Sequence, residues 1–351
     1  MEQRVLMKGN EALGYGAIKA GCRSFFGYPI TPQTELAAFM ARELPRVCGT
    51  YIQAESEISA INMVLGAAAA GKRAMTSSSS PGISLKTEGV SYIAASDLPA
   101  LIVNVQRGGP GLGSIQPAQG DYWQATRAMG HGDFRVIVLA PYSVQEMMDF
   151  VSLAFELSEK YRIPSMILSD GMLGQMMEPV VVDDTNSGIK QIEKPWATVG
   201  HADKRSHNII NSLYLTPSKL EAVVRERYDR YKVVQSTEQR AEEYLIDDAD
   251  TVIVAYGASA RIAYTAVNMA REKSKSVGLI RPITLWPFPE NIIKKTAKTA
   301  KKFLCVEMSM GQMIDDVKLA VNGAREVEFF GRVGGSIPTP NEILDKIQSM
   351  E

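Results

Sequence analysis

The chain has 351 residues, a formal net charge of −1 and 45% hydrophobic residues. This length predicts about two domains, with enough apolar residues for real cores. The near-neutral charge and the lack of a long basic block argue against nucleic acid or an anionic membrane surface as the main partner. No apolar run of about 18 residues occurs, and the start, Met-Glu-Gln-Arg, lacks a signal-peptide core. We therefore expect a soluble, cytoplasmic protein.

The cysteines and histidines predict no metal centre on this chain. Cys22, Cys48 and Cys305 are far apart and odd in number, so they offer neither a disulfide framework nor C-x-x-C spacing. An iron–sulfur cluster normally takes about four thiolates. The chain has 3 histidines in all, which is a poor basis for a catalytic zinc site. Any redox centre must then come from another chain.

The first part of the chain alternates short apolar runs with helical patterns. Residues 1–20 predict a strand and then a helix, and further strands are predicted at 22–26, 50–53, 74–76, 101–105, 136–139 and 165–168. Strands that alternate with helices imply a mostly parallel, doubly wound sheet. We therefore predict one three-layer α/β domain over residues 1–182.

A connector and a second α/β unit are predicted after it. Residues 183–188 break the pattern, and 189–216 are irregular. Residues 217–246 predict a charged helical segment that packs through an apolar stripe of Leu220, Val223, Val224, Tyr228 and Tyr231. New strands are predicted at 251–257, 277–280 and 303–306. The predicted connector is 183–248, and the predicted smaller α/β domain is 249–351.

Residues 27–35, Gly-Tyr-Pro-Ile-Thr-Pro-Gln-Thr-Glu, link a strand to a helix. Each proline fixes its own φ, and Tyr28 and Thr31, which precede prolines, are biased towards extended backbone. Open α/β sheets bind ligands at the carboxyl ends of their strands, where the Thr31 hydroxyl could hold a small anion. On residue chemistry alone, an ordinary loop with Thr31 or Gln33 as a helix cap is the favoured interpretation.

Two glycine-containing stretches resemble nucleotide-binding motifs, but neither fits the motif that it resembles. In residues 66–73, Arg73 stands where a phosphate-binding loop needs a hydroxyl for Mg²⁺, and the glycines close a helix. Residues 109–113 follow a strand, but Ser114 comes next and no helix obviously starts there. We therefore expect neither an NTPase nor a dinucleotide-binding fold.

Three charged side chains are candidates for chemistry. Glu55 and Glu57 precede a very apolar helix, where a carboxylate is stabilised by the helix dipole or, against an apolar wall, exchanges a proton. Arg107 ends a buried strand beside a glycine-rich loop and could clamp a carboxylate. In isolation, a helix-start role for the glutamates and a strand-end salt bridge for Arg107 are the simpler interpretations.

Several motifs together resemble one family, in order from about residue 5 to about residue 345. They lie at residues 27–35, 53–57, 77–86, 107–111, 131–133, 256–261 and 281–289. They resemble the alpha-type subunit of 2-oxoacid:ferredoxin oxidoreductases. The run Ser-Ser-Ser-Ser at 77–80 and Gln-Met-Met-Glu-Pro at 175–179 look most like the branched-chain, 2-oxoisovalerate type. The 2-oxoglutarate type, which usually has Thr-Ser-Gly-Pro-Gly in the serine loop, is the alternative.

The resemblance implies thiamine diphosphate chemistry, with coenzyme A as co-substrate and ferredoxin as electron acceptor. The first domain is similar to the pyrimidine-binding domain of thiamine enzymes, and the second to the transketolase carboxyl-terminal domain. By position, Glu57 would contact N1′ of the aminopyrimidine, with Glu55 as the alternative. Thr31 and Arg107 would hold the substrate carboxylate. The backbone of Tyr28, Pro29 and Ile30 and the serine loop, with Ser79 and Ser80, would line the cofactor.

The resemblance also implies partner subunits. The usual thiamine signature, Gly-Asp-Gly with an Asn about 25–30 residues on, supplies Mg²⁺ ligands for the diphosphate. It is not intact here, because Ser169 precedes Asp170-Gly171. We expect a beta-type subunit to bring Mg²⁺ and the diphosphate site, and other subunits, including a gamma-type one, to complete the complex and its iron–sulfur clusters. The alternatives are a non-catalytic scaffold subunit and a self-sufficient thiamine enzyme, which the missing signature disfavours.

Overall fold

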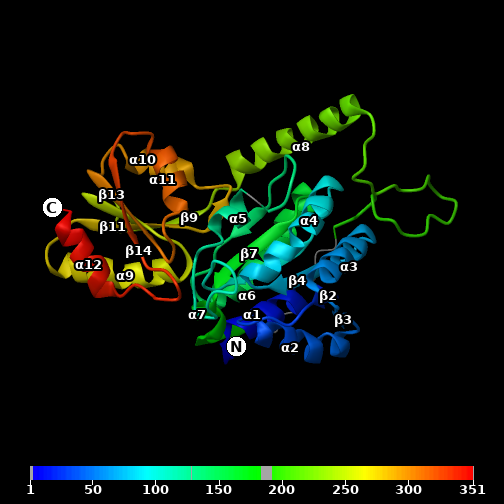
Figure 1. Cartoon of the computed structure of the whole chain (residues 1–351), viewed down its shortest axis with the longest axis horizontal. Helices are drawn as coiled ribbons and strands as arrows, with labels where there is room; N and C mark the ends of the chain where they lie inside the picture. The colour runs from blue at the N-terminus through cyan, green and yellow to red at the C-terminus, as the bar shows by residue number, and fades with distance from the viewer. Residues whose placement is uncertain (1–2, 128, 183–191, 351) are drawn as a thin grey trace.

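The computed structural model describes residues 3–127, 129–182 and 192–350. It contains two α/β units side by side along the long axis of the molecule, with a long helix above the first (Figure 1). The predicted break at residues 183–188 lies outside the described residues. None of the helices in the described part is long and apolar enough to cross a membrane.

The larger sheet has the strand order β12-β6-β7-β5-β4-β2-β3 among the described residues. Its strands are β2 (Ser24–Gly27), β3 (Thr50–Gln53), β4 (Ala74–Ser78), β5 (Leu101–Gln106), β6 (Ile137–Leu139), β7 (Ser165–Asp170) and β12 (Thr284–Trp286). All neighbours are parallel except β12, which runs antiparallel to β6. The mostly parallel sheet predicted from the sequence is therefore confirmed.

Helices cover both faces of this sheet. One face carries α1 (Gly9–Lys19), α2 (Thr34–Glu43) and α6 (Val144–Tyr161), whose apolar residues pack on β4, β5 and β7. The other carries α3 (Glu57–Ala69), α4 (Ser80–Ala95) and the short α5 (Tyr122–Thr126). Strands β5 and β7 are buried along their whole length, as expected of a sheet covered on both faces.

The smaller sheet has the order β14-β13-β10-β11-β9 in the described part of the chain. Its strands are β9 (Ala241–Tyr244), β10 (Thr251–Val254), β11 (Val277–Pro282), β13 (Lys302–Glu307) and β14 (Glu326–Gly331). Helices α9 (Gly257–Glu272) and α12 (Pro340–Ser349) pack on one face, and α10 (Glu290–Thr296) and α11 (Met313–Val321) on the other. This is the second three-layer unit that the sequence predicts.

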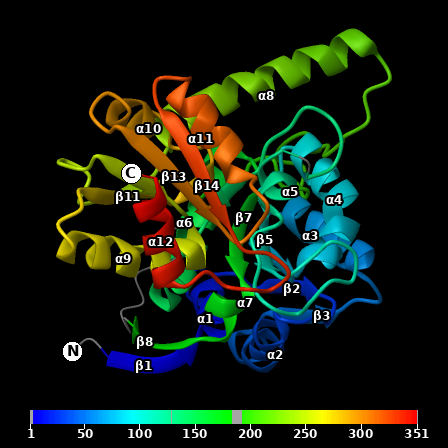
Figure 2. The same cartoon turned by 60° about the vertical axis from the view of Figure 1, so that its left-hand side comes forward.

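Several segments join the two units. Strand β12 comes from the second half of the chain but completes the larger sheet. The loop after β14 reaches back to the first unit, where Gly334 and Gly335 lie against Gly108 and Gln116 (Figure 2). Strands β1 (Gln3–Lys8) and β8 (Met177–Val182) form a separate antiparallel pair, and the short α7 (Gly171–Gln175) precedes β8.

The helical segment predicted at 217–246 is partly wrong. Helix α8 (Pro217–Thr237) ends earlier, and residues 241–244 form β9 because they pair antiparallel with β11. The predicted stripe packs only through its second half, where Tyr231 is buried and meets Trp286 edge-on. Leu220 is 42% exposed, and the first half of α8 extends beyond the body of the molecule (Figure 1).

Candidate functional site

The candidate residues gather at one edge of the larger sheet. Strands β5, β4, β2 and β3 are neighbours and parallel, so their carboxyl ends lie together. Arg107 follows β5, the serines end β4, residues 27–35 follow β2, and Glu57 comes shortly after β3. The carboxyl edge of such a sheet is the usual place for a ligand.

Gln33 joins the 27–35 connector to the serines. This side chain is fully buried. Its Oε1 accepts a hydrogen bond from the Ser77 hydroxyl at 2.6 Å, and its Nε2 donates to the carbonyl of Tyr28 at 3.3 Å. The bonds hold the connector against the end of β4. The sequence predicts Gln33 only as a possible helix cap, but its side chain makes no cap bond.

Arg107 connects Thr31 to the same edge. Its guanidinium donates to the carbonyl of Thr31 at 3.0 Å and to the carbonyl of Leu112 at 3.3 Å. The Nε atom is buried and has no partner. Thr31 itself is exposed. The two predicted carboxylate-binding residues therefore lie together, and Arg107 makes no strand-end salt bridge among the described residues.

Glu57 begins α3 and points inward. Ser56 caps this helix by accepting from the Ser59 N–H at 3.2 Å, and the cap orients the first turn. Glu57 is 6% exposed, whereas Glu55, before the cap, is exposed. A Cβ built on Gly82 would lie 2.7 Å from the Glu57 Oε1 and 2.1 Å from the Ser78 Oγ. The missing side chain at Gly82 thus leaves space for both groups.

Glu57, Ser78, Ser79 and Gly82 form what we call the polar cradle. The hydroxyls of Ser78 and Ser79 are buried and have no hydrogen-bond partner. An unsatisfied buried polar group costs about 1–3 kcal/mol, so natural proteins seldom keep one without a reason. Two such hydroxyls beside a buried carboxyl group fit a polar ligand with donors and acceptors of its own.

Asp121 lies beneath the serines and was missed by sequence reasoning. Its carboxylate accepts from the Ser80 hydroxyl at 2.6 Å and from the Asn104 side chain at 2.9 Å. Burial raises the pKa of Asp121, although both donors lower it. The bonds fix Ser80 at the start of α4. Ser80 is therefore engaged with the protein, while its neighbour Ser79 is not.

Lys86 is the second side chain that sequence reasoning missed. It lies in α4, is fully buried, and its Nζ donates to the carbonyl of Glu57 at 3.4 Å. One sequence pattern could have identified Lys86: it stands four residues after Gly82 and three before Gly89, which places all three on one face of a helix. The pattern places the lysine on the face of α4 that packs on α3.

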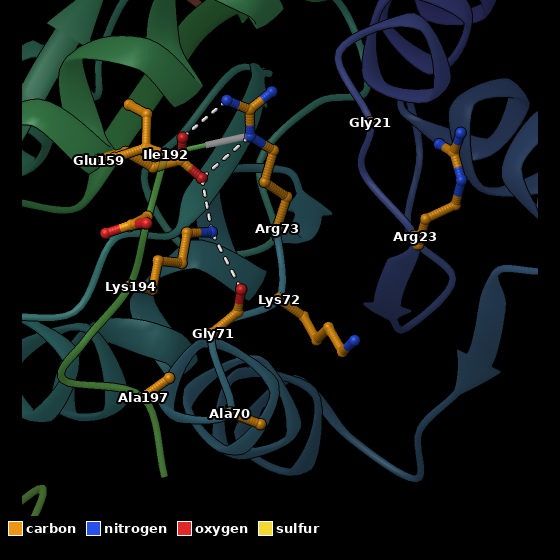
Figure 3. Close-up of a pocket in the computed structure, with 11 residues that line it drawn as sticks. Gly21, Arg23, Ala70, Gly71, Lys72, Arg73, Glu159, Ile192, Lys194 and Ala197 are labelled. Carbon is orange, nitrogen blue, oxygen red and sulfur yellow. Dashed lines mark hydrogen bonds and ion pairs between the residues drawn. The ribbon is translucent and has the colours of Figure 1, made fainter. Parts of the chain in front are cut away.

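A cavity of about 600 Å³ lies elsewhere, at the opposite edge of the sheet. Arg73 and Lys194 both point at Glu159 there (Figure 3), and their nearest nitrogens lie 2.6 and 2.7 Å from its oxygens. The same cations donate to carbonyls at the ends of α1 and α3. They are engaged in holding helix ends together, so the cavity adds nothing to the candidate site.

Two family models together match residues 15–343, and solved structures match nearly the whole chain. A model described as pyruvate flavodoxin/ferredoxin oxidoreductase, thiamine diphosphate-binding, matches residues 15–253, and one for pyruvate:ferredoxin oxidoreductase core domain II matches residues 249–343. The 2-oxoglutarate:ferredoxin oxidoreductase of Magnetococcus marinus superposes with a TM-score of 0.89 at 28% identity, over 99% of this chain and 65% of that one. A split-gene transketolase shares the fold alone, with a TM-score of 0.61 at 14% identity.

The fold and the family model thus place this chain in the thiamine-diphosphate-binding class. The ketoisovalerate oxidoreductase subunit VorB of Methanothermobacter thermautotrophicus is 47% identical, over 98% of this chain and 97% of that protein. The 2-oxoglutarate synthase subunit KorA of Methanocaldococcus jannaschii is 40% identical, over 96% and 97%. The chain belongs to the pyruvate flavodoxin/ferredoxin oxidoreductase family, and the resemblance seen in the sequence is confirmed.

Proposed function

We propose that this chain is the alpha-type subunit of a 2-oxoacid:ferredoxin oxidoreductase that acts on a branched-chain 2-oxoacid such as 2-oxoisovalerate. The complete enzyme would convert this acid and coenzyme A to an acyl-CoA and CO₂, with electrons passed to ferredoxin. The polar cradle carries the proposal: a buried glutamate beside two unpartnered hydroxyls, at the ligand-binding edge of a family fold.

Thiamine diphosphate would lie with its aminopyrimidine in the polar cradle. The bound cofactor supplies a nucleophilic carbon and an electron sink, which no side chain of the protein can provide. Glu57 would share a proton with N1′ of the ring, a role for which its exposed neighbour Glu55 is poorly placed. The backbone of Tyr28, Pro29 and Ile30 and the hydroxyls of Ser79 and Ser80 would line the rest of the ring site.

Arg107 and Thr31 would hold the carboxylate of the 2-oxoacid. The Arg107 Nε is buried and free to donate, and the Thr31 hydroxyl is exposed nearby. A charge-assisted hydrogen bond to a carboxylate is stronger than a neutral one. The pair would orient the acid so that its 2-oxo carbon faces the cofactor.

A branched aliphatic substrate is supported by the relatives. The two ketoisovalerate oxidoreductase subunits are 47% and 48% identical to this chain, whereas the 2-oxoglutarate synthase subunits of methanogens are 37% to 40% identical. A substrate with a second carboxylate needs a second cation, because an unpaired buried charge is costly. In the described part of the chain, the buried Lys86 near the cradle donates to the backbone carbonyl of Glu57 instead.

The active site would be completed by other subunits. Large apolar side chains are exposed around the candidate site, among them Leu112 at 85% and Ile58 at 50%, together with Tyr28, Ile52, Leu85 and Ile115. Large exposed apolar side chains gathered near a ligand site are typical of a protein–protein contact. We propose that a beta-type subunit covers it and brings Mg²⁺ and the diphosphate site. Iron–sulfur and gamma-type subunits would bring the clusters.

A scaffold without a catalytic role is the alternative to an active subunit. The candidate site opposes this alternative, because it brings together Glu57, Thr31 and Arg107 and keeps unpartnered buried hydroxyls. A purely structural subunit has no need of such hydroxyls. The division into residues 1–182, 183–248 and 249–351 is a further part of the proposal. Strand β12 belongs to the last segment by sequence but pairs with β6 in the sheet of the first. The cytoplasmic location expected from the sequence stays a prediction.

The test compares the isolated chain with the reconstituted complex. We expect the chain alone to bind thiamine diphosphate weakly and to reduce no dye with any 2-oxoacid, because it lacks an electron acceptor. We expect the complex to show a higher kcat/KM for 2-oxoisovalerate than for 2-oxoglutarate. Turnover by the chain alone would contradict the shared active site, and the reverse preference would make the 2-oxoglutarate enzyme the correct assignment.

A further inference from the structure

Lys86 occupies a place where lysine is rarely found. Helix α4 presents Gly82, Lys86 and Gly89 on one face, towards α3. A Cβ on Gly89 would lie 2.4 Å from the Ile61 Cγ2, and one on Gly82 would lie 2.7 Å from the Glu57 Oε1. The two helices are therefore in close contact on both sides of Lys86, which explains why the side chain is fully buried.

The ammonium group reaches the first turn of α3. Its Nζ lies 3.4 Å from the carbonyl oxygen of Glu57. Burial lowers the pKa of Lys86 to about 8, and the negative charge of Glu57 opposes this shift. The two groups form no direct ion pair in the described residues, so the attraction acts through space, where low polarity strengthens it. A buried ammonium without a counter-charge would be far more costly.

Other titratable groups on or against α4 have partners of their own. Glu88 accepts a hydrogen bond from the Tyr92 hydroxyl on the outer face, and the ring of His131 packs edge-on against Tyr92. Asp121 is bonded to Ser80 and Asn104. Within the described residues, Glu57 is thus the charged group that faces Lys86.

We propose that Lys86 is a positioning residue for Glu57: its buried ammonium, which donates to the Glu57 carbonyl, fixes the first turn of α3 so that the Glu57 side chain points into the polar cradle. This rests on the proposed role of Glu57 and adds the group that sets its orientation. Lys86 does not touch the cofactor or substrate sites and acts through Glu57.

The first experiment uses the assembled complex without cofactor. Lys86→Met, Glu57→Gln and the double variant are compared by thermal unfolding. We expect the double variant to be more stable than the sum of the single effects predicts, because each single change leaves one buried charge alone. As pH rises from about 8 to about 10.5, the wild type should gain stability relative to Lys86→Met, since the folded state releases the Lys86 proton there. The proposal is overturned if the stability effects of the two single changes add up in the double variant and the stability difference between the wild type and Lys86→Met does not change with pH.

The second experiment uses the complex with thiamine diphosphate and follows exchange of the cofactor's C2 proton at neutral pH. In Lys86→Met we expect exchange to slow about 10- to 100-fold, as is typical when a supporting partner is lost. Lys86→Arg should restore the exchange rate, and exposed Lys72→Met is the control. A lower midpoint of unfolding with an unchanged exchange rate would show a structural role and overturn the proposal.

The two hypotheses fail in different ways. If the wild-type complex shows no cofactor-dependent exchange, the proposed function is wrong. If the wild type exchanges and Glu57→Gln slows it while Lys86→Met does not, the proposed function stands and the role of Lys86 is wrong.

Discussion

Glu57 and Glu55 differ by two positions in the sequence but lie in opposite environments. The helix cap at Ser56 separates them, so that Glu57 turns inward against α4 while Glu55 stays in solvent. The family resemblance favours Glu57 for the contact with N1′, with Glu55 as the alternative. The burial of Glu57 supports that order, because a proton-sharing carboxyl group needs a water-poor site.

We expect Glu57→Gln to slow exchange of the cofactor's C2 proton by about 10²- to 10⁴-fold, the usual cost of losing a positioned acid–base group. Gln keeps the size and a hydrogen bond but cannot share a proton. The thermal midpoint should fall as well, because the buried Lys86 ammonium loses its counter-charge. Glu55→Gln is the control. Wild-type exchange in Glu57→Gln with a slow Glu55→Gln would show that the two residues were assigned the wrong way round.

At Arg107, we expect the Ala variant to weaken substrate use more than cofactor binding. A charge-assisted bond is worth roughly 1.5–3 kcal/mol, which corresponds to about one to two decades in kcat/KM for the 2-oxoacid. Arg107→Lys should also be impaired, because lysine cannot reproduce the planar fork that reaches Thr31 and Leu112. Exposed Arg46→Ala is the control. Loss of cofactor affinity with unchanged substrate kinetics would refute the assignment.

At the scale of elements, close packing of α3 on α4 decides the shape of the polar cradle. The glycines of α4 permit the approach, and Gly82 in particular leaves room for the carboxylate of Glu57 and the hydroxyl of Ser78. Both are the ends of side chains that can rotate away. A methyl group at this position would therefore disturb the site more than it would disturb the fold.

We expect Gly82→Ala to lower thiamine diphosphate affinity in the complex by at least about tenfold, that is by about 1.4 kcal/mol, with a small change in thermal midpoint. Gly66→Ala in α3 is the matched control. A Cβ there would meet nothing within 4 Å, so this change should stabilise the helix by up to about 1 kcal/mol. Calorimetric titration measures the cofactor affinity of both variants, and thermal unfolding measures their stability. Unchanged affinity in Gly82→Ala would show that the ring does not lie against Glu57.

At the scale of the whole molecule, buried polar groups hold the two units together. The Gln119 side chain donates to the carbonyl of Tyr256 at 2.8 Å and accepts from the Ser259 hydroxyl at 2.6 Å. The carboxylate of Asp170 accepts from the N–H groups of Met172 and Leu173, and also from Ala258 at the start of α9. Burial raises the pKa of Asp170 to about 6, although these bonds lower it.

This shift predicts a stability change with pH. The pKa of Asp170 is higher in the folded chain than in the unfolded one, so its protonated form favours folding and the benefit is lost as pH rises from about 4 to about 6. Relative to Asp170→Asn, the wild type should lose about 3 kcal/mol of unfolding free energy over this range. Denaturant titrations at each pH measure it, with exposed Asp149→Asn as the control. A difference that does not change with pH would contradict the shift.

The local sequence determined much of this protein. The strand β3 at residues 50–53 and the capped start of α3 follow from nearby residues, because short-range patterns and caps act within a few positions. The parallel sheet follows from alternating elements. The motifs at 27–35, 77–86 and 107–111 indicated the family and the candidate residues Thr31, Glu57 and Arg107.

Only the tertiary structure decided which side chains meet. The helical pattern at 217–246 ended early since β9 pairs with β11, and β12 joined the sheet of the other unit. Neither partner is near in sequence. The bonds of Gln33 to Ser77, Asp121 to Ser80 and Lys86 to Glu57 join residues that are 44, 41 and 29 positions apart. Contacts of this range depend on how layers pack, and no local pattern encodes them.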